Sequence, residues 1–137
     1  MSDRITLDSN ILIYAFADNN DFRKSIAIDI IAKCNIISIQ AVNETSYILL
    51  KKFKLPKEQL EKVIQFMKDQ FIISSLTTNI LDQTITLCKK YNFSFWDSMM
   101  IAAALDNHCS IIYTEDLSHD QLIESRLRIV NPFISKL

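Results

Sequence analysis

Hydrophobic residues follow two kinds of spacing along the 137-residue chain. Short runs of apolar and β-branched residues predict strands, and apolar residues three and four positions apart predict helices. The predicted strands are residues 5–7, 36–39, 71–74, 110–113 and 128–130. The predicted helices are residues 10–17, 22–33, 40–53, 56–69, 78–91, 97–107 and 121–126.

The order of these elements is β-α-α-β-α-α-β-α-α-β-α-β. Strands separated by helices favour parallel crossovers, so we expect an α/β fold: a three-layer sandwich around a central, mainly parallel sheet of roughly five strands. No linker or internal repeat interrupts the pattern, and residues 1–137 are expected to form a single domain. In such a sheet, ligands bind beyond the carboxyl ends of the strands.

Composition narrows the function mainly through what is missing. The chain has no glycine, which excludes P-loops, glycine-rich dinucleotide-binding turns and nucleophile elbows.

Fifteen Lys and Arg against 16 Asp and Glu leave a net charge of −1, so any nucleic-acid contact needs a local patch. The densest basic cluster contains Lys51, Lys52, Lys54 and Lys57. It either contacts an RNA backbone or keeps a helix end soluble.

The cysteines and the apolar runs favour a cytoplasmic protein without a membrane segment. Cys34, Cys88 and Cys109 are widely spaced, form no CxxC pair and border apolar stretches, so we expect them to be reduced core residues. The polar N-terminus does not resemble a signal peptide. The longest apolar runs, residues 11–17 and 99–105, are far shorter than the roughly 20 residues that a membrane span needs.

Two carboxylates follow predicted strands. Asp8 comes directly after the first strand, and Asp116 comes soon after the fourth, within a Thr-Glu-Asp sequence. Both therefore lie at the edge of the sheet where sites form. Each also has an ordinary alternative: Asp8 as a helix N-cap, and Asp116 as part of a solvated turn.

Two further carboxylates lie on predicted helices. Glu44 comes three residues after Ala41, which predicts that it shares the apolar face of its helix; alternatively, its carboxylate lies at the edge of that face, in solvent. Asp97 is predicted to be the N-cap of its helix, with Trp96 and Ile101 forming a hydrophobic staple around it.

The four carboxylates together indicate a metal-dependent chemistry. Acidic side chains that converge on one cleft repel one another, and a divalent cation relieves that repulsion. Hard oxygen ligands suit Mg²⁺ or Mn²⁺. Such ions activate water and stabilise charge on a transferring phosphate, which makes phosphodiester hydrolysis the favoured reaction class.

Four segments at these positions resemble the PIN-domain ribonucleases of the VapC-like type, the toxins of bacterial and archaeal toxin–antitoxin pairs. The segments are LDSNILIYA with Asp8, NETSYIL with Glu44, FWDSMMIAAAL with Asp97 and IIYTEDLSHDQ with Asp116. Chain length and element order match as well, so the resemblance covers essentially the whole chain.

The resemblance implies an endoribonuclease that uses Mg²⁺ or Mn²⁺. Asp8, Glu44 and Asp97 would be the main metal-site acids, directly or through water, and Asp116 would complete the cluster. The residues that would orient these carboxylates or the attacking water are Ser9, Asn10 and Thr114.

One position departs from the family pattern. Asp120 stands where relatives usually have glycine, which leaves the fourth acid open between Glu115, Asp116 and Asp120; Asp116 is preferred. The resemblance also implies RNA as the substrate, a homodimer, and a small antitoxin protein whose amphipathic helix could occupy an apolar groove.

Three other protein classes are alternatives for these residues. A receiver-type phospho-switch needs an aspartate after the third strand and a lysine after a later one, and neither is present. A haloacid-dehalogenase-type phosphatase needs Asp-x-Asp where this chain has Asp8-Ser9-Asn10. A non-catalytic PIN-fold protein that binds RNA or serves as a scaffold remains the alternative to an enzyme.

Overall fold

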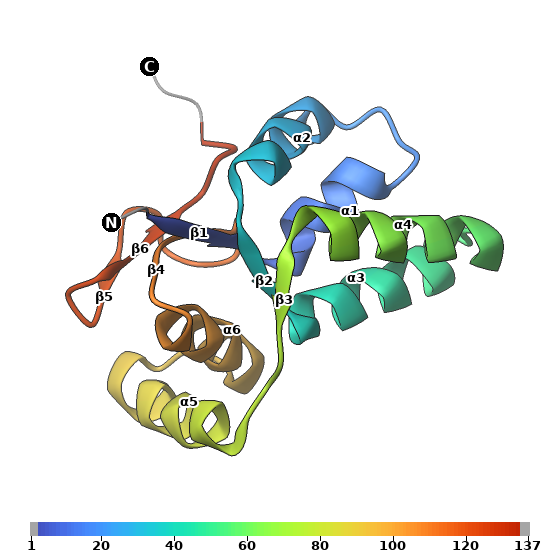
Figure 1. Cartoon of the computed structure of the whole chain (residues 1–137). Helices are drawn as coiled ribbons and strands as arrows, with labels where there is room; N and C mark the ends of the chain where they lie inside the picture. Colours follow the sequence, from blue (N-terminus) through green and yellow to red (C-terminus); the bar gives the residue numbers. More distant parts are fainter. Residues whose placement is uncertain (1–2, 135–137) are drawn as a thin grey trace.

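The computed structural model describes residues 3–134 and confirms the α/β class. The strands are β1 (Arg4–Leu7), β2 (Ile36–Ser38), β3 (Ile72–Ser74), β4 (Cys109–Tyr113), β5 (Leu122–Ile123) and β6 (Leu127–Val130). The helices are α1 (Ser9–Phe16), α2 (Arg23–Lys33), α3 (Ile39–Lys51), α4 (Lys57–Gln70), α5 (Thr78–Tyr91) and α6 (Phe95–Asp106) (Figure 1).

The strands are grouped into two adjoining sheets rather than one. Four strands form a sheet in the order β1-β4-β6-β5, and β2 pairs with β3. Every pair is parallel except β5 with β6. Asn35 joins the two sheets, because its N–H donates to the Ile5 carbonyl at 3.0 Å and its Oδ1 accepts from the Ile5 N–H at 2.8 Å. Parallel pairing places the carboxyl ends of β1, β4 and β6 at one edge.

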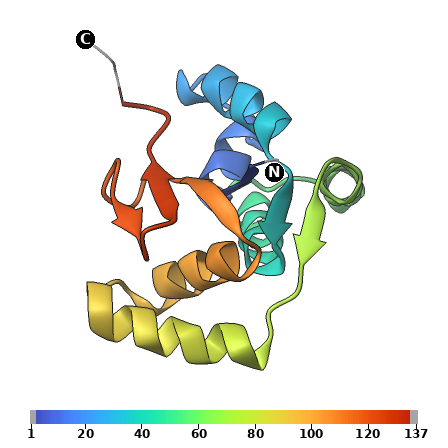
Figure 2. The same cartoon turned by 60° about the vertical axis from the view of Figure 1, so that its left-hand side comes forward.

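Helices cover both faces of the strands, as a three-layer sandwich requires. Figure 2 shows α1 and α2 on one side and α5 and α6 on the other. The core between the layers contains fully buried side chains from the strands and helices, among them Leu7, Ile112, Ile11 and Ile101. Removing apolar surface from water stabilises a fold by about 25 cal/mol per Å², so this buried core is the main source of stability.

The predicted helix over residues 121–126 is wrong. Leu122–Ile123 forms β5 instead, which pairs antiparallel with β6 across a tight turn. Glu124 and Ser125 have φ angles of 52° and 59°, and this left-handed conformation cannot continue a right-handed helix. The sequence carries no glycine to mark this turn, so its apolar spacing alone suggested a helix.

The predicted N-cap of α6 is also wrong. The helix begins at Phe95, and the side chain of Ser94 caps it by accepting a hydrogen bond from the Asp97 N–H at 3.1 Å. Asp97 is thus the third residue of the helix, in the Ser-x-x-acid arrangement typical of a capped N-terminus. Its carboxylate is consequently not occupied in capping its own helix.

A serine also ends β2 one residue earlier than predicted. Ser38 closes the strand and caps α3, because its hydroxyl accepts from the Ala41 N–H at 3.3 Å. Ile39 therefore starts the helix instead of ending the strand. Caps of this kind set where the segments after the strands point, and these segments carry the candidate site residues.

The remaining structural expectations concern cysteines and membrane segments. All three cysteines are free; Cys34 and Cys109 are buried, as predicted, and Cys88 is half-buried. Among residues 3–134, no helix combines the length and apolar character that crossing a membrane would require.

Candidate active site

A small pocket beyond the carboxyl ends of β1 and β4 is lined by all four predicted carboxylates: Asp8, Glu44, Asp97 and Asp116. The pocket has a volume of about 50 Å³, and its other lining residues are Ser9, Gln40, Trp96 and Met100. The four acids come from four separate segments of the chain. Asp8, Glu44 and Asp116 follow parallel strands, whose carboxyl ends lie on one side, and Asp97 reaches the same place from the first turn of α6.

Asp8 forms the buried floor of this pocket. Its backbone N–H donates to the Tyr113 carbonyl at 2.9 Å, which ties it to the end of β4. Its side chain also caps α1, because Oδ1 accepts from the Ser9 N–H at 2.7 Å. Asp8 therefore has both of the roles that its position in the sequence allowed: it is the N-cap of α1 and it lines the pocket.

Thr114 and Asn10 hold the side chains of Asp8 and Asp116 in place through hydrogen bonds. The buried Thr114 hydroxyl donates to Asp8 Oδ2 at 2.9 Å and accepts from the Asp116 N–H at 3.2 Å. Asn10 Nδ2 donates to Asp116 Oδ2 at 3.1 Å and to Thr114 Oγ1 at 3.2 Å. A continuous hydrogen-bond chain thus connects two acids that are more than 100 residues apart in sequence.

Of the three candidates for the fourth acid, only Asp116 lines the pocket. Glu115 faces the other way: its carboxylate accepts from Arg23 at 3.2 Å and from the Tyr14 hydroxyl. Asp120 is exposed and has a φ of 69°, the conformation that favours glycine, which is the residue usual here in the resembling family.

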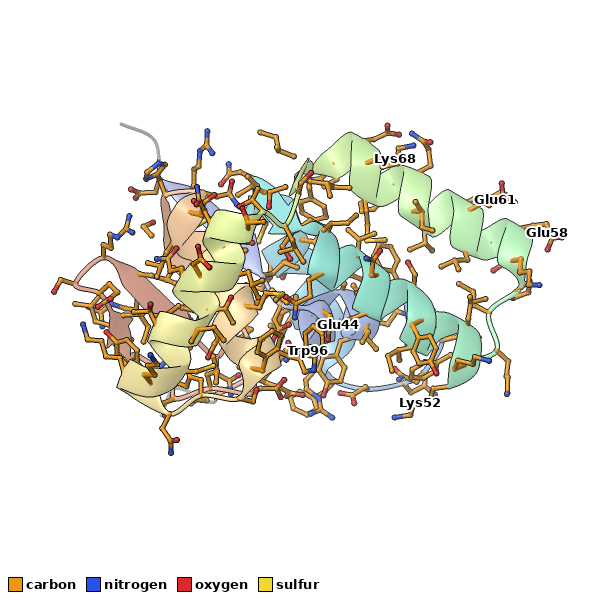
Figure 3. All side chains as sticks on the ribbon, turned by 90° about the horizontal axis from the view of Figure 1, so that it is seen from below. Glu44, Lys52, Glu58, Glu61, Lys68 and Trp96 are labelled. Atoms are coloured by element: carbon orange, nitrogen blue, oxygen red, sulfur yellow. The ribbon has the colours of Figure 1, made fainter. Side chains whose placement is uncertain are left out.

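Glu44 and Asp97 are more accessible than Asp8. Glu44 is exposed, so the prediction that it shares the buried face of its helix is wrong. That face is made by Ala41, Thr45 and Leu49, and Glu44 lies beside it, next to Trp96 (Figure 3). Asp97 is half-buried. The pocket thus has a buried floor and an open acidic rim.

The environment makes Asp8 hard to ionise. The pKa of Asp8 is raised from its ordinary value of 3.8 to about 6. Burial is the largest cause, and the negative charges of Asp116 and Glu44 add to it, whereas hydrogen bonds from Thr114 and Ser9 partly oppose the rise. A raised pKa with identifiable charged neighbours is typical of a functional site.

Comparison with protein families identifies the chain. The family model described as the PIN domain matches residues 5–124. The chain belongs to the PIN domain family. The sequence resemblance to this family is therefore confirmed. No curated protein matches the chain significantly.

Two solved structures share the PIN fold with this chain at low sequence identity. One is a toxin–antitoxin complex from Klebsiella pneumoniae, with a TM-score of 0.71 and 19% identity over 96% of this chain and 98% of that chain. The other is VapC20 of Mycobacterium tuberculosis, a sarcin–ricin loop cleaving toxin. Its TM-score is 0.66, with 14% identity over 82% of this chain and 91% of that chain.

The donor atoms of this PIN domain suit a hard divalent cation. Carboxylate oxygens are the ligands that Mg²⁺ and Mn²⁺ prefer, and a cation would offset the charges that raise the pKa of Asp8. Within residues 3–134, no three His, Cys, Asp or Glu side chains are already gathered as a metal-binding group. Mg²⁺ often takes only one or two carboxylates and keeps several waters, so such a group is not a requirement.

Three residues that line the pocket were not predicted as site residues from the sequence: Gln40, Trp96 and Met100. The sequence pattern predicts a hydrophobic staple for Trp96 and only the start of a helix for Gln40. In the structure Gln40 Nε2 donates to the Trp96 carbonyl at 3.2 Å, and both residues line the acidic pocket. The available signal was position, because Gln40 is the second residue after β2 and Trp96 precedes Asp97.

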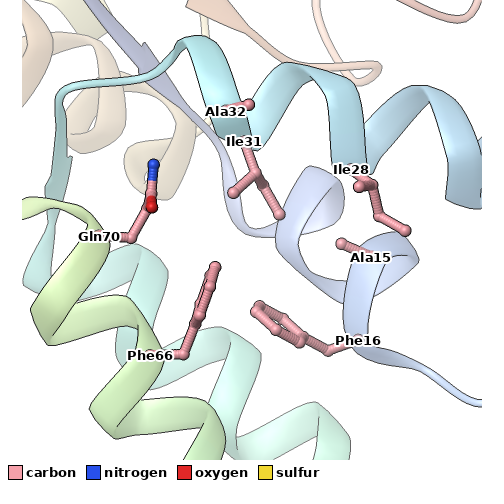
Figure 4. Close-up of a pocket in the computed structure, with 7 residues that line it drawn as sticks. All are labelled: Ala15, Phe16, Ile28, Ile31, Ala32, Phe66 and Gln70. Atoms are coloured by element: carbon pink, nitrogen blue, oxygen red, sulfur yellow. The ribbon is translucent and has the colours of Figure 1, made fainter.

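A larger apolar pocket lies away from the acids, between α1, α2 and α4 (Figure 4). Its volume is about 410 Å³. The rings of Phe16 and Phe66 meet edge to face inside it, with centroids 5.6 Å apart. Ile28 and Phe66 leave much of their apolar surface exposed at its rim.

Proposed function

We propose that this chain is a metal-dependent endoribonuclease that hydrolyses RNA phosphodiester bonds, and that it is the toxin of a toxin–antitoxin pair. The observation that carries the proposal is the pocket in which Asp8, Glu44, Asp97 and Asp116 come together at the carboxyl edge of the sheet. Membership of the PIN domain family supports the same conclusion.

Each polar residue of the pocket has a role in this proposal. Asp8, Glu44, Asp97 and Asp116 would hold Mg²⁺ or Mn²⁺, directly or through water. When bound, the ion would lower the pKa of a water molecule and stabilise charge on the phosphate. Asn10 and Thr114 hold the Asp116 carboxylate and backbone in place, and the Ser9 N–H orients Asp8.

Cleavage of RNA tests the proposal. Wild type and Asp97→Asn, purified identically, would be incubated with total RNA and structured RNAs in Mg²⁺, Mn²⁺ or EDTA. We expect metal-dependent cutting by wild type and a loss of more than about 100-fold in Asp97→Asn, because a carboxylate at the metal site is removed. Glu61→Gln is the matched control, since Glu61 is exposed on the outer side of α4 and points away from Glu44 (Figure 3).

Two results of the cleavage assay would count against the proposal. Equal cutting by wild type and Asp97→Asn would point to a contaminating ribonuclease and contradict the proposal. No cutting by any variant would favour the alternative of a non-catalytic PIN-fold protein that binds RNA or serves as a scaffold.

The toxin role adds a protein partner. One structure with this fold is a toxin–antitoxin complex, and the apolar pocket between α1, α2 and α4 suits the apolar face of an antitoxin helix. Expression of wild type in a bacterial host should therefore arrest growth, whereas Asp97→Asn should not. Normal growth with both would contradict the toxin role and leave the ribonuclease proposal to the cleavage assay.

Three further expectations belong to this proposal. Residues 1–137 would act as a single domain, two copies would form a homodimer, and the protein would act in the cytoplasm. The cluster of Lys51, Lys52, Lys54 and Lys57 is available for contact with RNA, because these lysines are exposed at the end of α3, in the following turn and at the first residue of α4.

A further inference from the structure

A third pocket, distinct from the apolar pocket between α1, α2 and α4, opens directly beside the acidic one. Its volume is about 650 Å³, and it is lined by Gln40, Asn43, Glu44, Tyr47, Leu76 and Trp96. Three of these residues, Gln40, Glu44 and Trp96, also line the acidic pocket. Anything that fills the larger pocket therefore lies next to the proposed reaction site.

The walls of this pocket are unusually apolar for a protein surface. Tyr47 is 60% exposed and Trp96 is 63% exposed. Trp96 is held by an edge-to-face contact with Phe95, with ring centroids 5.1 Å apart. Exposed aromatic groups beside a polar site mark a binding surface, and their rings are suited to stacking on nucleobases.

A buried hydrogen-bond acceptor is left without a partner between the two pockets. Gln40 is only 5% exposed, and among the described residues its Oε1 has no hydrogen-bond partner. Its orientation is fixed, because the Trp96 carbonyl can only accept and therefore requires the Nε2 group. An unpaired buried acceptor is costly, so a ligand that supplies an N–H or O–H group here would be favoured.

We infer that this pocket is a subsite for the base of an unpaired nucleotide, next to the phosphate at the acidic site. The inference rests on the proposed ribonuclease function. Tyr47 and Trp96 contact the base, and Gln40 Oε1 accepts from its amino or imino group. A base inside a duplex is already stacked and paired, so the subsite selects single-stranded or extruded nucleotides at the point of cleavage.

The chain contains one tryptophan, so Trp96 itself reports on the pocket. Full-length wild-type protein in Mg²⁺ would be titrated with a ten-nucleotide single strand of RNA, made with phosphorothioate linkages that resist cleavage, while tryptophan fluorescence is followed. We expect saturable quenching with the single strand and little change with the same strand annealed to its complement. Anisotropy of an end-labelled strand measures binding independently of Trp96.

Substitutions at Tyr47 separate stacking from a general effect. In the same assay, Tyr47→Ala should weaken binding of the single strand roughly tenfold, because a stacking ring is lost. Tyr47→Phe keeps the ring and should bind within about twofold of the parent. Phe22→Ala, which removes an exposed aromatic residue at the start of α2 and outside the pocket lining, is the control and should leave binding unchanged.

Four results would overturn the subsite. They are binding by anisotropy without a change in Trp96 fluorescence, equal binding by Tyr47→Ala and its parent, no binding of the strand at all, and a fluorescence change that depends on protein concentration alone. The last would show a second copy of the chain covering the pocket. Any of them can occur while wild type still cleaves RNA, so the failure of the subsite is distinguishable from failure of the ribonuclease proposal.

Discussion

At the scale of single residues, Asp8 shows how one side chain can serve the fold and oppose it. As the N-cap of α1 it stabilises the helix, yet its burial beside Asp116 and Glu44 raises its pKa to about 6. In the unfolded chain the pKa of Asp8 has its ordinary value of 3.8. Between pH 3.8 and about 6, Asp8 is therefore protonated in the folded protein but ionised in the unfolded chain. Stability without metal therefore falls as pH rises from about 4 to 6, by up to about 3 kcal/mol.

Replacing Asp8 by asparagine should remove this pH dependence. In EDTA at pH 7.5, we expect Asp8→Asn to raise the free energy of unfolding by about 1–3 kcal/mol, because a buried charge is eliminated. Below pH 4 the gain should disappear, since Asp8 is then protonated in both states. Urea unfolding at several pH values measures it.

Asp29→Asn is the matched control, because Asp29 is exposed on α2 and should change stability little at any pH. If wild type and Asp8→Asn lost stability in parallel between pH 4 and 6, Asp8 would not be the group responsible.

The sequence predicted residues of the pocket only where chemistry and position agreed. Asp8 and Asp116 follow strands, and together with Glu44 and Asp97 they suggest a site, although each acid alone has an ordinary alternative role. Gln40 and Trp96 were missed because an amide and an aromatic ring have ordinary roles in most helices. Their importance depends on one contact, from Gln40 Nε2 to the Trp96 carbonyl, which joins α3 to α6 and is not visible in a linear pattern.

At the scale of elements, the absence of glycine explains why the turn between β5 and β6 was predicted as part of a helix. Helices were located within one or two residues from apolar spacing, but turns lacked their usual marker. Six residues of the described chain have positive φ, and none is glycine: Lys54, Asn92, His108, Asp120, Glu124 and Ser125. Two of them lie in the segment that was wrongly predicted to be a helix.

His108 provides a test of this strain. It has a φ of 58° in the turn between α6 and β4, where its N–H donates to the Leu105 carbonyl at 3.0 Å. Glycine adopts this conformation without a steric penalty, and this gain exceeds the additional entropy that glycine loses on folding. His108→Gly should therefore raise the free energy of unfolding by roughly 0.5–1 kcal/mol. The midpoint of thermal unfolding should rise by about 2–4 °C.

The reverse substitution serves as the control. His108→Val should lower stability, because a β-branched residue tolerates positive φ least. Equal stability of the glycine, histidine and valine proteins would show that the turn is not strained at this position.

At the scale of the whole molecule, the fold concentrates negative charge at one edge. Asp8, Glu44, Asp97 and Asp116 come from segments that only the packed sheets bring together, so their mutual repulsion exists in the folded chain and not in the unfolded one. A cation that binds this edge would consequently stabilise the entire fold, because it binds the folded state alone.

Thermal unfolding with and without Mg²⁺ therefore measures metal binding without any RNA. At concentrations 10–100 times the dissociation constant, Mg²⁺ should stabilise wild type by about 1–3 kcal/mol. Asp97→Asn should lose most of this gain, whereas Glu61→Gln on α4 should keep it. An equal gain in wild type and Asp97→Asn would mean that the ion binds elsewhere. The cluster would then destabilise the fold without a compensating ligand, and it would have no metal-binding role to explain its place at the edge of the sheet.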